Sequence, residues 1–140
     1  MFESLCSSSE DRIRILSVQD SALVNALQRQ AAVVLQKSVR EGFGLTVTEA
    51  MGKGAAVIGG RVGGIRHQIE DGVTGFLVGS VEQAAARIVQ LIKDPRLRAV
   101  LARASTAVRR NFLLTRLLEE WLDLIEAFEA NFRLRGNPRT

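Results

Sequence analysis

Two glutamates that bracket a glycine-containing turn have the types and spacing to bind a phosphorylated ligand. Glu41 directly precedes Gly42-Phe43-Gly44, and Glu49 comes later with seven residues between the two acids. Glycines allow a ligand to approach the backbone closely. A helix that begins after such a turn presents N–H groups without intrahelical partners and a partial positive charge. We therefore expect a phosphate or diphosphate at the backbone N–H groups of Gly44, Leu45 and Thr46.

The two carboxylates suggest what lies on either side of that phosphate. A carboxylate can accept two hydrogen bonds from neighbouring hydroxyl groups, and both sugars and riboses offer such a pair. A diphosphate with a polyol on each side is a nucleotide-sugar. The residues therefore predict that one of Glu41 and Glu49 holds a sugar and the other holds a ribose.

Simpler interpretations of the same residues remain open at this point. Thr46 to Glu49 matches a capping box, in which Glu49 would only satisfy the start of the helix. Glu41 can be a solvated charge in a loop. Phe43 can anchor the core without contacting any ligand. A single Gly-x-Gly is weak evidence for phosphate binding on its own.

The surrounding pattern predicts the elements that position this turn. Short apolar runs with β-branched residues predict strands at 12–18, 31–35, 55–58 and 75–78. Helical spacing predicts helices at 21–30, 45–53, 65–70, 81–93, 95–111 and 115–132. Gly54 is expected to stop the second helix, and Asp94-Pro95 to cap and begin the fifth. Strands that alternate with helices predict an α/β fold, a partial Rossmann-like parallel sheet flanked by helices, with extra helices at the carboxyl end.

Composition narrows the class of partner. The chain has 140 residues, a net charge of +4, no Tyr, and no basic tract interleaved with aromatic residues, so we expect no nucleic acid partner. The positive charge suits an anionic small molecule equally well. Cys6 is the only cysteine and no Cys/His cluster is present, so we expect no metal and a reducing, cytoplasmic location. No apolar run approaches the ~20 residues of a membrane span.

Three stretches together resemble a known family. They are EGFGLTVTEAM at 41–51, VGGI at 62–65 and DGVTGFLV at 71–78, with Gly54 between the first two. The combination resembles the retaining glycosyltransferases of the family-4 kind, which have two Rossmann-like domains (the GT-B fold). REGFGLTVTEAM at 40–51 is most similar to the trehalose glycosyltransferring synthases of that group. The resemblance covers roughly residues 11–132.

The resemblance implies a role for each residue of the turn. Glu41 would hydrogen-bond the donor sugar, and Glu49 would hold the ribose hydroxyls. The sugar and the far phosphate would meet the backbone N–H groups of Gly42, Phe43, Gly44 and Leu45, and Thr46 would add its amide or hydroxyl. Enzymes of this type need no metal or cofactor. Their leaving phosphate helps to deprotonate the acceptor on the same face, so anomeric configuration is retained.

The residues and the resemblance together predict how the chain is divided. We expect a disordered lead at 1–10, a truncated nucleotide-sugar-binding domain at 11–132 and a flexible tail at 133–140. Two further strands, an Arg/Lys pair for the diphosphate and the acceptor-binding domain are expected to lie outside this sequence. Without those strands, the strand at 31–35 would expose an apolar edge that recruits a second copy.

Two functions follow from these expectations. The first is the donor-binding part of a retaining glycosyltransferase that uses UDP- or ADP-glucose, with trehalose as a candidate product and with little activity expected from this chain alone. The alternative is a truncated, non-catalytic domain that folds and self-associates without turnover. His67, the single histidine, is expected to be a surface residue of a helix and not a catalytic base.

Overall fold

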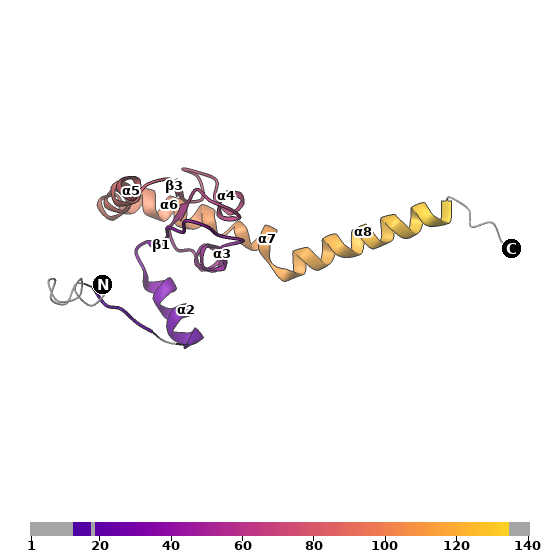
Figure 1. Ribbon diagram of the computed structural model, residues 1–140, viewed down its shortest axis with the longest axis horizontal. Helices are drawn as coiled ribbons and strands as arrows, with labels where there is room; N and C mark the ends of the chain where they lie inside the picture. Colours follow the sequence, from indigo (N-terminus) through magenta and orange to yellow (C-terminus); the bar gives the residue numbers. More distant parts are fainter. Residues whose placement is uncertain (1–12, 18, 135–140) are drawn as a thin grey trace.

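A three-stranded parallel sheet forms the centre of the computed structural model, which describes residues 13–17 and 19–134. The strands are β1 (Val34–Gln36), β2 (Val57–Gly60) and β3 (Phe76–Val78), and their spatial order is β1-β2-β3. Val34 pairs with Val57, and Ile58 pairs with Phe76. Figure 1 shows the sheet inside a body of short helices. The predicted α/β class with a parallel sheet is confirmed.

Seven helices accompany the sheet in the described ranges. In chain order they are α2 (Ser21–Gln30), α3 (Leu45–Gly52), α4 (Ile65–Gln68), α5 (Val81–Lys93), α6 (Pro95–Ser105), α7 (Val108–Phe112) and α8 (Leu114–Leu134). The helices predicted at 21–30, 45–53 and 81–93 agree with the structure to within one residue. The starts of α2, α5 and α6 follow local chemistry, because Asp20, Ser80 and Asp94 each accept a hydrogen bond from the first turn of the helix that follows them.

The core consists of two apolar clusters, one on each face of the sheet. Val57 belongs to a cluster with residues of α3, α4 and α7, whereas Ile58 belongs to a cluster with β3, α5 and α6. Successive side chains of a strand point to opposite faces, so neighbouring residues of β2 serve different clusters. β2 is buried along its whole length because helices cover it on both sides.

The strand predicted at 12–18 is wrong for every residue of it that the structure describes. Residues 13–17 form no strand, and Ile13, Ile15 and Leu16 are each more than half exposed. An alternating pattern gives a stable strand only where a neighbouring strand accepts its backbone hydrogen bonds. β1 pairs with β2 alone in the described sheet, so the segment has no such neighbour.

The single helix predicted at 95–111 is divided in two. α6 ends at Ser105, and α7 begins at Val108. The Ser105 hydroxyl donates to Ala102 O at 2.8 Å, and the Thr106 hydroxyl donates to Arg103 O at 2.8 Å. Hydroxyl groups that bond to the preceding turn compete with the helical backbone hydrogen bonds. Two such residues in sequence explain the break.

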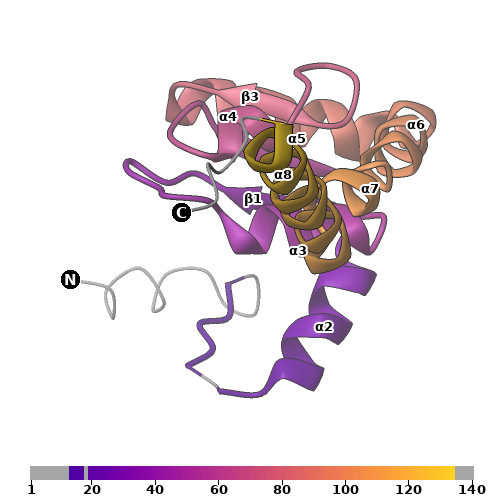
Figure 2. The same cartoon turned by 90° about the vertical axis from the view of Figure 1, so that its right-hand side faces the viewer.

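The last helix leaves the body of the molecule. Figure 1 shows α8 projecting away from the sheet, and Figure 2 views the molecule almost along that helix. α8 extends through Leu134, two residues beyond the predicted end and into the expected tail. The rest of that tail and the expected lead at 1–10 lie outside the described residues. None of the described helices combines the length and apolarity needed to cross a membrane.

Candidate functional site

The turn after β1 delivers the chain directly into α3. Gly44 is the N-cap residue of α3 and has a left-handed backbone, with φ +90° and ψ 56°. L side chains rarely adopt this conformation, and a Cβ at this position would lie 2.8 Å from Ile65 Cγ1. Glycine is therefore required at this position both by the backbone angle and by the close approach of α4.

The first backbone N–H groups of α3 remain open. Val47 and Thr48 donate to Gly44 O, so they are already used inside the helix. Among the residues described, nothing accepts a hydrogen bond from the N–H groups of Leu45 and Thr46. These two groups point out of the start of a helix, where an anion is favoured. The predicted phosphate-binding position therefore has the local geometry that it needs.

A second glycine pair supports this turn from behind. Gly64 N–H donates to Gly42 O at 2.9 Å, and the amide of Gln68 donates to Phe43 O at 2.5 Å. A Cβ at Gly63 would lie 1.7 Å from Glu41 O, a separation that no side chain could occupy. The backbone of the 63–64 loop thus packs directly on the backbone of the 41–43 turn and holds that turn in one place.

Glu41 is fixed by residues of the strand that precedes it. Its Oε2 accepts a hydrogen bond from Gln36 Nε2 at 2.7 Å and another from Ser38 Oγ at 3.2 Å. The residue is half-buried at the carboxyl end of β1, where ligands bind in open parallel sheets. The interpretation of Glu41 as a freely solvated loop charge is therefore wrong.

Glu49 lies in the second turn of α3 and faces α2. Its Oε2 accepts a hydrogen bond from Gln28 Nε2 at 3.4 Å, and Lys53 Nζ donates to the other end of the same Gln28 amide. Because α3 begins after Gly44, Thr46 is inside the helix and cannot be its N-cap. The capping-box interpretation of Glu49 is therefore wrong.

The two glutamates have separate hydrogen-bond partners and separate surroundings. Glu49 lines a cavity of about 740 Å³ together with Lys53 and the start of α2. Glu41 instead belongs to the β1 end, beside the turn. In the chain, the open N–H groups of Leu45 and Thr46 lie between the two acids, each of which has its own hydrogen-bond partners.

Phe43 packs against α7 and remains partly exposed. Its ring lies 5.9 Å from the ring of Phe112 in α7 at an interplanar angle of 60°, which is the tilted arrangement that aromatic pairs prefer. Phe43 is nevertheless 42% exposed and lines an apolar pocket of about 310 Å³ with Leu114 and Leu117. It anchors the turn to α7 and still leaves part of the ring free.

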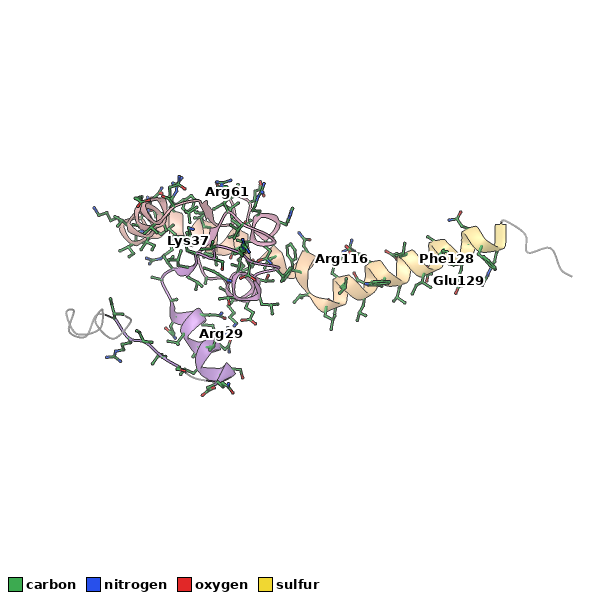
Figure 3. The ribbon with its side chains drawn as sticks, in the orientation of Figure 1. Arg29, Lys37, Arg61, Arg116, Phe128 and Glu129 are labelled. Atoms are coloured by element: carbon green, nitrogen blue, oxygen red, sulfur yellow. The ribbon has the colours of Figure 1, made fainter. Side chains whose placement is uncertain are left out.

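An ion pair lies beside β2 and β3, where Arg61 directly follows β2 and Asp71 is bonded to Leu77 of β3. Arg61 Nη2 lies 2.6 Å from Asp71 Oδ2, and Leu77 N–H donates to the other oxygen of Asp71. Partial burial acts to raise the pKa of Asp71, but the hydrogen bonds from Leu77 and Arg61 and the Arg61 charge lower it below its ordinary value. Figure 3 shows Arg61 and Lys37 on the body of the molecule.

Other expectations concern residues outside the turn. His67 is exposed on α4, as predicted for a surface helix residue. In the described ranges, His, Cys, Asp and Glu form no group of three that could hold a metal ion.

Four polar residues that the resemblance did not single out hold the two glutamates and the turn. They are Gln28, Gln36, Ser38 and Gln68. Gln36 directly follows the apolar run of 31–35, and a polar amide at the end of a buried strand is the signal that could have identified it.

Comparison with known proteins gives matches over most of the chain. Residues 8–108 match the family described as Glycosyl transferases group 1. The trehalose synthase of Pyrococcus horikoshii is 50% identical over 105 residues, which are 74% of this chain and 25% of that protein. The trehalose synthase of Rubrobacter xylanophilus is 48% identical over 102 residues, 72% of this chain and 24% of that protein. The chain thus spans about a quarter of the length of these relatives.

Solved structures agree with this result. Sucrose-phosphate synthase from Thermosynechococcus elongatus superposes with a TM-score of 0.80 at 25% identity, over 93% of this chain and 34% of that one. Anabaena HepE in complex with UDP-glucose superposes with a TM-score of 0.75 at 25% identity, over 84% and 33% of the two chains. The fold is that of the GT-B glycosyltransferases, and the chain belongs to the group 1 family of glycosyl transferases.

Proposed function

We propose that this chain is the donor-binding part of a retaining glycosyltransferase. The nucleotide-diphosphate-sugar would bind at the turn after β1 and the first two turns of α3, residues 41–49. The observation that carries the proposal is the pair of open N–H groups at the start of α3, together with two hydrogen-bonded carboxylates that precede and follow them in the chain. Helix N-termini favour phosphate, and carboxylates favour vicinal hydroxyls. The ligand that offers both is a nucleotide-sugar.

Each residue of the turn has a role in this proposal. Glu41 accepts hydrogen bonds from the transferred sugar, and Glu49 accepts them from the ribose in the cavity beside α2. The diphosphate lies between these two acids. It meets the backbone N–H groups of Gly42, Phe43, Gly44, Leu45 and Thr46, with no metal or other cofactor. Glu41 is the residue of this chain that comes nearest to the reacting carbon.

The proposed substrate is UDP- or ADP-glucose, and trehalose is the proposed product. The HepE structure contains UDP-glucose, and the two curated relatives are trehalose synthases, which supports a glucosyl donor. The acceptor sugar would be bound by another domain. In the retaining route the leaving diphosphate takes the acceptor proton on the same face of the donor. This chain then contributes binding and orientation, and by itself gives no turnover.

One observation also favours the alternative of a self-associating domain. β1 pairs only with β2 among the described strands, and Leu35 is 43% exposed at that edge. Unpaired strand edges recruit further strands. We propose that this edge offers a second copy a small contact, three residues long. A domain that associated through it and bound no nucleotide would fit the alternative.

Calorimetric titration of three variants with UDP and with UDP-glucose separates the roles. Glu49→Gln should weaken both ligands about tenfold or more, because both contain the ribose and a charge-assisted hydrogen bond contributes about 1.5–3 kcal/mol. Glu41→Gln should weaken UDP-glucose by a similar factor and leave UDP unchanged. Glu82→Gln, in the exposed first turn of α5, is the matched control and should change neither.

Two results would contradict the proposal. Equal heats from the wild type and Glu49→Gln would remove the ribose role. An absence of UDP binding to the folded wild-type chain at millimolar ligand would favour the non-catalytic alternative.

A further inference from the structure

Gln28 is the only residue of α2 that is buried, and both ends of its side-chain amide are bonded to residues of the α3 segment. It is 7% exposed, whereas the two leucines and the valine of α2 are 36–49% exposed. Its Nε2 donates to Glu49 Oε2 at 3.4 Å, and its Oε1 accepts a hydrogen bond from Lys53 Nζ. α2 lies beside α3 in both views of the ribbon (Figures 1 and 2). The side chain that α2 buries is therefore an amide and not an apolar group.

The two charges bonded to Gln28 determine which way its amide points. A carboxylate only accepts hydrogen bonds and an ammonium group only donates them, whereas an amide has one end of each kind. In the reverse orientation the amide oxygen would face Glu49 and the amide nitrogen would face Lys53, so both contacts would be repulsive. Because a buried polar group without a partner is costly, the observed orientation is the favoured one.

The amide of Gln28 takes the place of a direct ion pair between Glu49 and Lys53. These residues are four apart, with the acid first, which is the order and spacing that favours an ion pair on a helix. Glu129 and Arg133 of α8 have the same order and spacing, and they form an ion pair at 3.3 Å. Among the residues that the structure describes, no ion pair joins Lys53 to Glu49, and each is bonded to Gln28 instead.

We propose that Gln28 is a positioning residue for the ribose of the nucleotide, because it keeps the Glu49 carboxylate from pairing with Lys53. The inference rests on the proposed function, in which Glu49 accepts hydrogen bonds from the ribose. Gln28 bonds to Oε2 of that carboxylate, and no described residue donates to its Oε1. Glu49 and Lys53 both line the 740 Å³ cavity beside α2. A lysine paired with Glu49 would therefore compete with the ribose hydroxyls for the same oxygen atoms.

The stability of the fold gives no comparable reason for a glutamine at position 28. Leucine favours a helix about as well and has no polar group that needs a partner when it is buried. Glu49 is exposed and Lys53 is half-buried, so water can reach both charges once the amide is gone. Gln28→Leu should therefore leave the midpoint of urea unfolding unchanged or raise it. A positioning role and a purely structural role thus predict different results.

Calorimetric titration with two nucleotides isolates the contribution of the ribose hydroxyls. UDP has both of them and 2′,3′-dideoxyuridine diphosphate has neither, whereas the base and the diphosphate are the same. The wild type should bind UDP about tenfold more tightly, because the dideoxy nucleotide cannot make the charge-assisted hydrogen bonds to Glu49. Gln28→Leu should weaken UDP about three- to fivefold, which is what an exposed pair between Lys53 and Glu49 can contribute, and should leave the dideoxy nucleotide unchanged.

A second substitution tests whether Lys53 is the cause. Gln28→Leu/Lys53→Met has no lysine to pair with Glu49, so it should restore the wild-type preference for UDP over the dideoxy nucleotide. Added salt should raise that preference in Gln28→Leu alone, because salt screens an exposed ion pair. Gln30→Leu makes the same chemical change at an exposed position of α2 and is the matched control, which should alter neither affinity.

The outcomes separate this inference from the proposed function. Unchanged UDP affinity in Gln28→Leu, together with weaker UDP binding by Glu49→Gln, would overturn the role of Gln28 and leave the proposed function intact. Equal weakening of both nucleotides, with a lower midpoint of unfolding, would show that Gln28 acts only through the fold. A double variant that folds like the wild type but does not regain the preference would also contradict the proposal. A wild type that binds both nucleotides equally would remove the ribose role of Glu49, and this inference with it.

Discussion

The turn at residues 41–44, called the donor turn below, and the last helix α8 differ in how closely the rest of the chain packs on them. At the turn, Gly63 and Gly64 bring one loop against another with no side chain between them, and the carbonyl oxygens of Gly42 and Phe43 accept hydrogen bonds from Gly64 and Gln68. In α8 the backbone is a regular helix, but its large apolar side chains are about half or more exposed. The first region is packed on both sides by the described chain, whereas the second leaves an apolar face exposed.

This difference predicts where substitutions matter. A side chain added at Gly63 or Gly64 would have to displace backbone atoms of the turn, and a closely packed region cannot easily adjust to that. A side chain truncated on the apolar face of α8 loses mainly contacts with water, because that face is 49–70% exposed.

The largest effect is expected from Gly63→Ala. A Cβ there would lie 1.7 Å from Glu41 O, and Gly63 has a φ of +44°. Overpacking of the turn and the left-handed backbone together should lower the free energy of unfolding by about 4 kcal/mol. Gly42→Ala is the matched control, since nothing lies within 4 Å of its added Cβ. Urea unfolding of both variants measures the difference, and equal midpoints would show that the loops are not packed as described.

A smaller change in the free energy of unfolding is expected for truncation of a leucine in the core, and almost none for the same truncation on α8. Leu101 in α6 is 1% exposed, so Leu101→Ala should lower the free energy of unfolding by about 3 kcal/mol through the cavity that it leaves. Leu122→Ala makes the same chemical change on α8, where the residue is 60% exposed. In dilute solution it should change stability by less than about 0.5 kcal/mol. A large loss from Leu122→Ala in the monomer would place α8 against the body.

The smallest effect comes from the Arg61–Asp71 ion pair. The pKa of Asp71 is lowered in the folded chain, so its contribution to stability is present above the ordinary aspartate pKa. It is lost as the pH falls through the lowered value, in the acid range below about 4. The pair is exposed, which limits its contribution to less than about 1 kcal/mol.

The thermal midpoint of Asp71→Asn compared with the wild type checks this expectation. The wild type should be slightly more stable near pH 7, and the difference should shrink as the pH is lowered toward 3. Arg116→Gln on α8, which removes an exposed pair at 3.0 Å with Glu120, provides the comparison from the other region. A difference at Asp71 that grows on acidification would show that its pKa is raised instead.

The sequence was informative where local pattern and tertiary packing agree. The 81–93 helix was predicted to the residue, because Ser80 caps it and its apolar residues recur at helical spacing. The glycines of 42–44 and 63–64 indicate turns. The parallel sheet places a candidate ligand site at the carboxyl end of β1. The assignment of the turn and its two acids as a candidate site depended on the family resemblance, since Gly-x-Gly alone is common.

The sequence was misleading where a partner outside the local pattern decides the outcome. Residues 13–17 alternate like a strand but have no described strand beside them. The break after Ser105 depends on a buried hydroxyl group that also lies 3.3 Å from the carbonyl oxygens of Met51 and Ala55. The hydrogen bonds from Gln36 and Gln28 to the two glutamates join positions that local periodicity cannot connect.

The hydrogen bond from Gly64 to Gly42 O has a spectroscopic consequence. The Gly64 amide proton reports on the peptide group of the donor turn although Gly64 belongs to a different loop. Any ligand that repositions Gly42 must alter that proton's chemical shift and its protection from solvent exchange. A single backbone resonance therefore offers a direct indicator of occupancy, readable by NMR without a label on the nucleotide.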